Sequence, residues 1–110
     1  MTGLYLIMRL KDVADALTLY FNKKYPEFKG FFISKESIEP TKINAYKAYK
    51  VEIYWHLPKK NHLVFTYQMV DRCLDGDKEA LKERYSTVLL EQVFTNLNKI
   101  ENEVIQIGRI

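Results

Sequence analysis

Apolar residues recur every three or four positions near the start of the chain, a spacing that predicts an amphipathic helix. The residues of this stripe are Leu6, Leu10, Val13, Leu17 and Phe21. Thr2 is placed to cap the start of the helix. Pro26 is expected to end it by Lys24–Tyr25, because the residue before a proline disfavours the helical conformation.

A second stripe with the same spacing follows the acidic turn at residues 75–77 and runs from Lys78 to about Glu103. Its members are Leu81, Tyr85, Val88, Leu89, Val93, Leu97, Ile100 and Val104. It predicts one continuous helix of roughly 25 residues, about twice the usual length in globular proteins. Residues 104–110 place three isoleucines around Gly108, which admits a short fourth strand after the helix.

Between the two helices, three segments alternate apolar and polar residues, which predicts β-strands at Phe31–Ile38, Ala45–Leu57 and His62–Val70. In the second strand the odd positions from Tyr49 to Leu57 are apolar and form a core face. The even positions form a solvent face and comprise Tyr46, Lys50, Glu52, Tyr54 and His56.

Residues that face each other across an antiparallel pair share one face of the sheet, so the two core faces constrain the hairpin register. A three-residue turn at Pro58–Lys60 pairs residues whose numbers sum to 118. Trp55 then lies opposite Leu63 on the core face. His56 lies opposite His62 on the solvent face, although other even sums remain open.

These elements predict one α+β domain over residues 1–110, in the order α-β-β-β-α, with both helices packed on one face of an antiparallel sheet. The expected core comprises Leu10, Val13, Leu17, Phe21, Val51, Ile53, Trp55, Phe65, Tyr67, Leu89, Val93 and Leu97. A length of 110 residues fits a single core of this kind.

The net charge of +3 is too small to indicate nucleic acid by itself, but the charge is uneven along the chain. Residues 29–62 carry seven basic and three acidic groups, whereas residues 63–110 carry six and eight. Cys73 is the single cysteine, so we expect no disulfide-linked partner. With no apolar run long enough for a membrane span, we expect a cytoplasmic protein.

No arrangement of residues points to catalysis, a cofactor or a metal ion. A His56–His62 pair would supply two metal ligands, whereas a zinc site needs at least three from the protein. Aligning Gly76 with a calcium-binding loop puts Lys82 where a bidentate glutamate is required. Cys73 follows Arg72, but no histidine is near it in the sequence. We therefore expect a protein that is not an enzyme.

Two binding functions remain. The favoured one is a small accessory or assembly protein, for example from a virus or mobile element, that contacts itself or another protein through an open sheet edge or the C-terminal helix. Its expected interface residues are Leu90, Phe94, Leu97 and Val104. The alternative is nucleic-acid binding by rings and cations on the sheet, through Tyr46, Lys47, Lys50, Tyr54, Lys59 and Lys60.

Overall fold

The computed structural model describes residues 10–41, 46–72 and 88–109. Its elements are α1 (Leu10–Lys24), β1 (Phe31–Pro40), β2 (Tyr46–His56), β3 (Asn61–Arg72), a helix over residues 88–95, and α3 (Leu97–Gly108). The predicted α+β class and the order of helix, three strands and helical C-terminal region are confirmed. Predicted features at Thr2, Cys73 and residues 75–77 lie outside the described residues.

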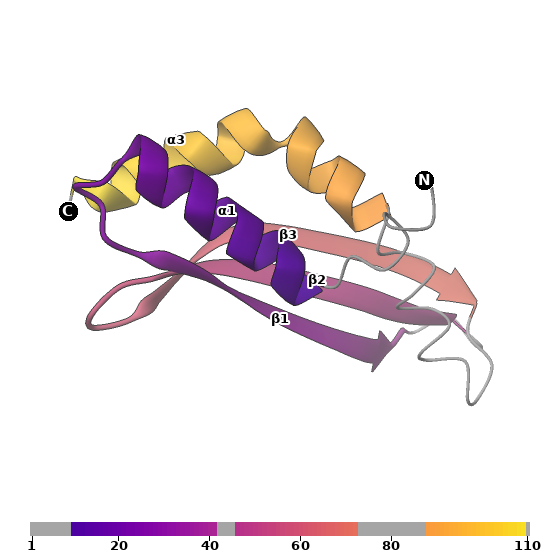
Figure 1. Ribbon diagram of the computed structural model, residues 1–110. Helices are drawn as coiled ribbons and strands as arrows, with labels where there is room; N and C mark the ends of the chain where they lie inside the picture. Colours follow the sequence, from indigo (N-terminus) through magenta and orange to yellow (C-terminus); the bar gives the residue numbers. More distant parts are fainter. Residues whose placement is uncertain (1–9, 42–45, 73–87, 110) are drawn as a thin grey trace.

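The strands form one antiparallel sheet in the order β1-β2-β3, so β2 is central and both other strands are edges. Figure 1 shows the helices on the same face of this sheet, with α1 over β1 and the C-terminal helices over β3. In the described part of the chain, the opposite face carries no helix. This two-layer arrangement gives the sheet one core face and one outer face.

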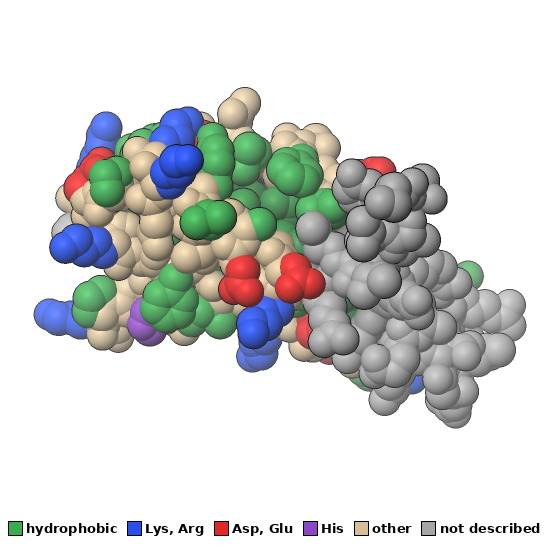
Figure 2. Space-filling model, viewed as in Figure 1, with side chains coloured by type: hydrophobic (Ala, Val, Ile, Leu, Met, Phe, Trp, Pro, Cys, Tyr) green, Lys and Arg blue, Asp and Glu red, His purple; other side chains and the backbone are tan. Residues whose placement is uncertain are grey.

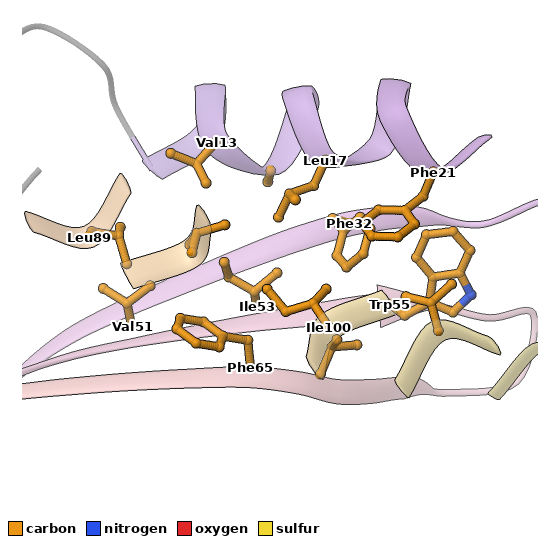
Figure 3. Close-up of a cluster of buried hydrophobic side chains, with 14 of the residues drawn as sticks. Val13, Leu17, Phe21, Phe32, Val51, Ile53, Trp55, Phe65, Leu89 and Ile100 are labelled. Carbon is orange, nitrogen blue, oxygen red and sulfur yellow. The ribbon is translucent and has the colours of Figure 1, made fainter. Parts of the chain in front are cut away.

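The core lies between the helices and the sheet (Figure 3). Val13, Leu17 and Phe21 reach down from α1 toward Ile53 and Trp55 on β2. Nine of the twelve predicted core residues are buried, namely Val13, Leu17, Phe21, Val51, Ile53, Trp55, Phe65, Leu89 and Val93. Leu10, Tyr67 and Leu97 are partly buried against the same cluster. Hydrophobic periodicity therefore identified the core, because each helix and strand buries only one of its faces.

Two glycines allow the layers to approach closely. A methyl group on Gly30 would lie 2.5 Å from Trp55 Cζ2, and one on Gly108 would lie 2.7 Å from Phe28 Cγ. Both distances are too short for a carbon–carbon contact. Gly30 therefore lets the indole ring of Trp55 lie against the start of β1.

The predicted hairpin register is confirmed in one half of the β2–β3 pair and wrong in the other. Tyr49 faces Met69 and Ile53 faces Phe65, as a sum of 118 requires. A β-bulge after Ile53 then shifts the register, so Trp55 faces His62 rather than Leu63. The extra residue is Val64, and both Val64 and Phe65 are buried. Burying two consecutive side chains on one face is what this bulge achieves.

The prediction of one continuous C-terminal helix is also wrong, because the helix breaks at Asn96, whose φ and ψ are −101° and 15°. The Asn96 side-chain amide donates to the carbonyl of Gln92 at 2.7 Å. Asparagine is a poor residue for a helix interior because its side chain competes for such backbone groups. The fourth strand is absent from the described residues up to position 109, since α3 continues to Gly108.

Candidate protein interface at the β3 edge

The backbone bonds that close the two hairpins determine which groups each edge strand directs outward. Thr41 N–H donates to Tyr46 O at 3.3 Å, and Leu57 N–H donates to Lys60 O at 3.1 Å. Backbone groups of successive residues in a strand point to opposite sides. In β1, the backbone N–H and C=O groups of odd-numbered residues therefore form hydrogen bonds with β2. Those of even-numbered residues point to the open edge. Beyond the bulge, the outward-facing residues of β3 are Thr66, Gln68 and Val70.

The edge of β1 is occupied in part by the chain itself. Phe32 N–H, which points away from β2, donates to Thr18 Oγ1 of α1 at 2.8 Å. The Thr18 hydroxyl in turn donates to the carbonyl of Ala14 at 2.8 Å. Farther along, β1 carries Lys35, Glu36 and Glu39 and ends at Pro40. Charges and a proline are features that natural sheets use to prevent edge pairing.

Glu36 also ties β1 to the central strand. Tyr49 donates a hydrogen bond from its hydroxyl to Glu36 Oε2 at 2.9 Å. Burial and this hydrogen bond both raise the pKa of Tyr49, so its hydroxyl stays protonated and remains a donor. The charged edge of β1 is thus part of the fold's own hydrogen-bond network.

The edge of β3 has the opposite character. From Leu63 to Val70 it contains no charged residue, no proline and no glycine. Leu63 and Val70 are 49% and 51% exposed. Among the described residues, no strand lies beside this edge. An uncharged edge strand with unpaired backbone groups is a site for pairing with another strand.

A groove of about 350 Å³ follows this edge beneath the C-terminal helices. Residues 63–67 of β3 form one side of it. The other side consists of the polar side chains of Gln92, Asn96, Lys99 and Glu103. Their spacing of three and four places them in one row along the helices. The groove therefore places a strand edge beside a row of hydrogen-bonding side chains.

A polar cluster fixes the helical layer above the groove. Lys24 Nζ lies 2.8 Å from Glu101 Oε1, and the Tyr25 hydroxyl donates to the same oxygen. The hydrogen bonds from Lys24 and Tyr25 lower the pKa of Glu101. The charge of Lys24 also lies 5.6 Å from the centres of the Tyr20 and Tyr25 rings. These contacts join the end of α1 to α3.

On the outer face of the sheet, a carboxylate occupies the centre of the predicted nucleic-acid surface. Tyr54 donates a hydrogen bond to Glu52 Oε2 at 2.7 Å, and Lys50 Nζ lies 3.6 Å from Glu52 Oε1. The hydrogen bond from Tyr54 and the charge of Lys50 lower the pKa of Glu52. Two of the six side chains predicted to contact nucleic acid, Lys50 and Tyr54, therefore interact with a carboxylate.

The other four predicted nucleic-acid residues do not join this pair as one surface. Tyr46 lies on the outer face and is exposed. Lys47 has the opposite parity in β2 and therefore lies on the helix side of the sheet. Lys59 and Lys60 are exposed in the loop between β2 and β3. The structure thus distributes the six residues over two faces and a loop.

The predicted His56–His62 pair is not formed, because the bulge changes its register. His56 faces Asn61, and its Nδ1 lies 2.7 Å from Asn61 Oδ1. The ring of Phe31 lies 4.4 Å from the His56 ring between centroids, and Figure 2 shows a histidine beside hydrophobic side chains at this end. His62 faces Trp55 on the other side of the sheet. Within the described ranges, no three potential ligand side chains are placed to hold a metal ion.

The four interface residues predicted on the C-terminal helices differ in accessibility. Val104 is fully buried in the core, whereas Leu90 and Leu97 are partly buried against it. Phe94 is 64% exposed. On α1, Leu19 is 73% exposed, and hydrophobic side chains are visible over the helical layer in Figure 2. Of the four predicted residues, Phe94 offers the largest accessible surface.

Sequence analysis predicted an open sheet edge in general terms, without identifying β3 as the strand that forms it. Its signal in the sequence is the absence of charge from Leu63 to Val70, in a chain in which 28% of residues are charged. Strand periodicity alone does not reveal it, because alternation locates faces of a sheet rather than edges.

Comparison of the chain with protein-family models, with curated proteins and with solved structures gives no match. No helix in the described part of the chain is long and apolar enough to cross a membrane.

Proposed function

We propose that this protein is a non-catalytic interaction module whose β3 edge binds an extended segment of a protein partner. The observation that carries the proposal is the uncharged run from Leu63 to Val70 on an edge strand with outward-facing backbone groups. Each amide and carbonyl on such an edge requires a hydrogen-bond partner when it is removed from water. An added strand supplies those partners at regular intervals.

The groove supports the same function by offering contacts to side chains. A strand paired with β3 would direct alternate side chains toward the helices and toward the outer face. Those on the helix side would meet the polar row of Gln92, Asn96, Lys99 and Glu103. Those on the outer face would lie beside Leu63 and Thr66. Backbone bonds would provide affinity and the polar row would provide selectivity.

Selection from a displayed library of extended peptides tests this function, with the chain immobilised at low density so that copies do not meet. Selected peptides should bind the wild type and lose at least about tenfold in affinity for Gln68→Pro, because that outward amide is removed. Ser34→Pro removes an outward amide from β1 and is the matched control. Peptides that bind Gln68→Pro as well as wild type would refute the β3 edge as the binding surface.

A further inference from the structure

The two edges of the sheet differ in which strand they can accept. β3 is uncharged from Leu63 to Val70, whereas β1 carries Lys35, Glu36 and Glu39 and ends at Pro40. A partner strand with the charges of β1 would set them beside uncharged residues and leave them without opposite charges. Within the described sheet, the edge that matches β3 in charge is β3 itself.

We propose that the strand bound at the β3 edge is β3 of a second copy of this chain, an inference that rests on the proposed function above. A two-fold axis would relate the copies and would pair the strands antiparallel. The combined sheet would have six strands, with β1 at both outer ends. Because the β1 edges carry charges, a proline and the Thr18 contact, addition of further copies stops at the dimer.

The uncharged run and the bulge together define the register. Side-chain parity requires paired residue numbers to have an even sum, so that outer face meets outer face. A sum of 134 pairs residues 65–69, which lie beyond the bulge, with themselves and places the axis at Tyr67. The outward backbone groups of Thr66 then face those of the partner's Gln68, and the reverse. A sum of 136 or more brings residues 71–72 into the pair, beyond the uncharged run.

At the axis, the two Tyr67 residues form a non-hydrogen-bonded pair. Such pairs have Cα atoms about 4.5 Å apart, within the range of about 4.4–6.8 Å that a disulfide can span. A cysteine at position 67 should therefore join to the same position of the second copy. This register places Thr66 opposite the partner's Gln68, so a cysteine at position 66 would not face its own counterpart.

The first experiment is oxidative cross-linking of the full chain in a Cys73→Ser background. Tyr67→Cys should give at least about tenfold more covalent dimer than Thr66→Cys, because the geometry of the pair selects for the disulfide. Ser37→Cys, at the middle of β1, is the control for pairing through the other edge and should remain uncross-linked. Equal cross-linking of all three variants would refute the register.

The second experiment measures solution mass by light scattering over a range of concentrations. Wild-type chain should be a dimer, and Gln68→Pro should raise its dissociation constant at least about 30-fold, since one outward amide is lost from each copy. Ser34→Pro should remain dimeric. If Gln68→Pro does not retain the wild-type circular dichroism spectrum, Gln68→Lys replaces it, because a lysine on an edge also opposes pairing.

The outcomes separate this inference from the proposed function. A wild-type dimer that Gln68→Pro or Gln68→Lys dissociates supports both. If the wild-type chain is a monomer, the partner at the β3 edge is not a second copy. The proposed function still stands in that case if the selected peptides bind the wild type but not Gln68→Pro. A dimer unaffected by either variant forms elsewhere and overturns the inference. Open-ended polymers would overturn closure at the β1 edges.

Discussion

β1 and β3 are edges of the same sheet, yet they present different surfaces to solvent. β1 is closed at one end by the Thr18 hydroxyl and carries three charged residues before a terminal proline. β3 has a similar length but is uncharged from Leu63 to Val70, and no strand in the described part of the chain lies beside it. Solvent exposure alone therefore does not distinguish a protected edge from one suited to pairing; charge and local contacts do.

The two edges also differ in how each strand meets the helices. α1 lies against β1 and reaches its edge with Thr18. The C-terminal helices instead leave a groove of about 350 Å³ beside β3. The bulge at Val64 twists β3 locally, which shortens the stretch available for regular pairing to the residues beyond it.

The largest effect on stability is expected where Gly30, just before β1, packs against Trp55. Gly30→Ala places a methyl group 2.5 Å from Trp55 Cζ2 and should lower the free energy of unfolding by about 1–3 kcal/mol through overpacking. Chemical denaturation measures this change. Adding Trp55→Phe, which removes the second ring, should make the double variant more stable than the sum of the single effects predicts. Additive effects would show that the two residues do not clash.

The Thr18 contact at the β1 edge is expected to have the next largest effect. Thr18→Val leaves Phe32 N–H without its acceptor and should lower the free energy of unfolding by about 1–2 kcal/mol. The matched control is Thr66→Val on β3, where the exposed side chain should contribute less than about 0.5 kcal/mol. Equal losses in the two variants would contradict the difference between the edges.

The link between α1 and α3 predicts a smaller, pH-dependent effect. Because the pKa of Glu101 is lowered in the folded state, its contribution is present above the ordinary value of 4.5 and is lost as pH falls through the folded-state pKa. Glu101→Gln should therefore be less stable than wild type at neutral pH. The two proteins should converge in acid, as followed by thermal unfolding. A difference that persists at low pH would mean that the carboxylate charge is not responsible.

The smallest effect is expected on the face between the two edges. Since Glu52 holds Lys50 and Tyr54, wild-type chain should bind a single-stranded oligonucleotide weakly, and Lys50→Ala with Tyr54→Phe should change that binding little. Fluorescence anisotropy at two salt concentrations measures this. Tight, steeply salt-dependent binding that the double variant abolishes would favour the nucleic-acid function instead.

The sequence predicted the core more accurately than the surfaces. Val13, Leu17 and Phe21 face Ile53 and Trp55 as their spacing requires, because a helix and a strand each expose one repeating face to the core. The four interface residues predicted on the C-terminal helices do not share one accessible surface. Val104 is fully buried while Phe94 is largely exposed, although both are apolar positions of the region predicted as one continuous helix.

The candidate site depended on details that periodicity does not encode. One extra residue, Val64, moved His62 to the opposite face and removed the expected pairing with His56. A hydrogen bond between Asn96 and Gln92 marks the break in the C-terminal helix. The bulge buries two consecutive side chains, and the break accompanies a side-chain bond to the backbone; the spacing of apolar residues marks neither.

By itself, the sequence determined the α+β order, the buried faces of α1 and β2 and the uncharged run in β3, because these depend on residue type and spacing along the chain. Only the tertiary structure decided that β1 and β3 are both edges, that Thr18 reaches one of them, and that a groove follows the other. Edges and grooves arise from contacts between residues far apart in the sequence, where local periodicity carries no information about neighbours in space.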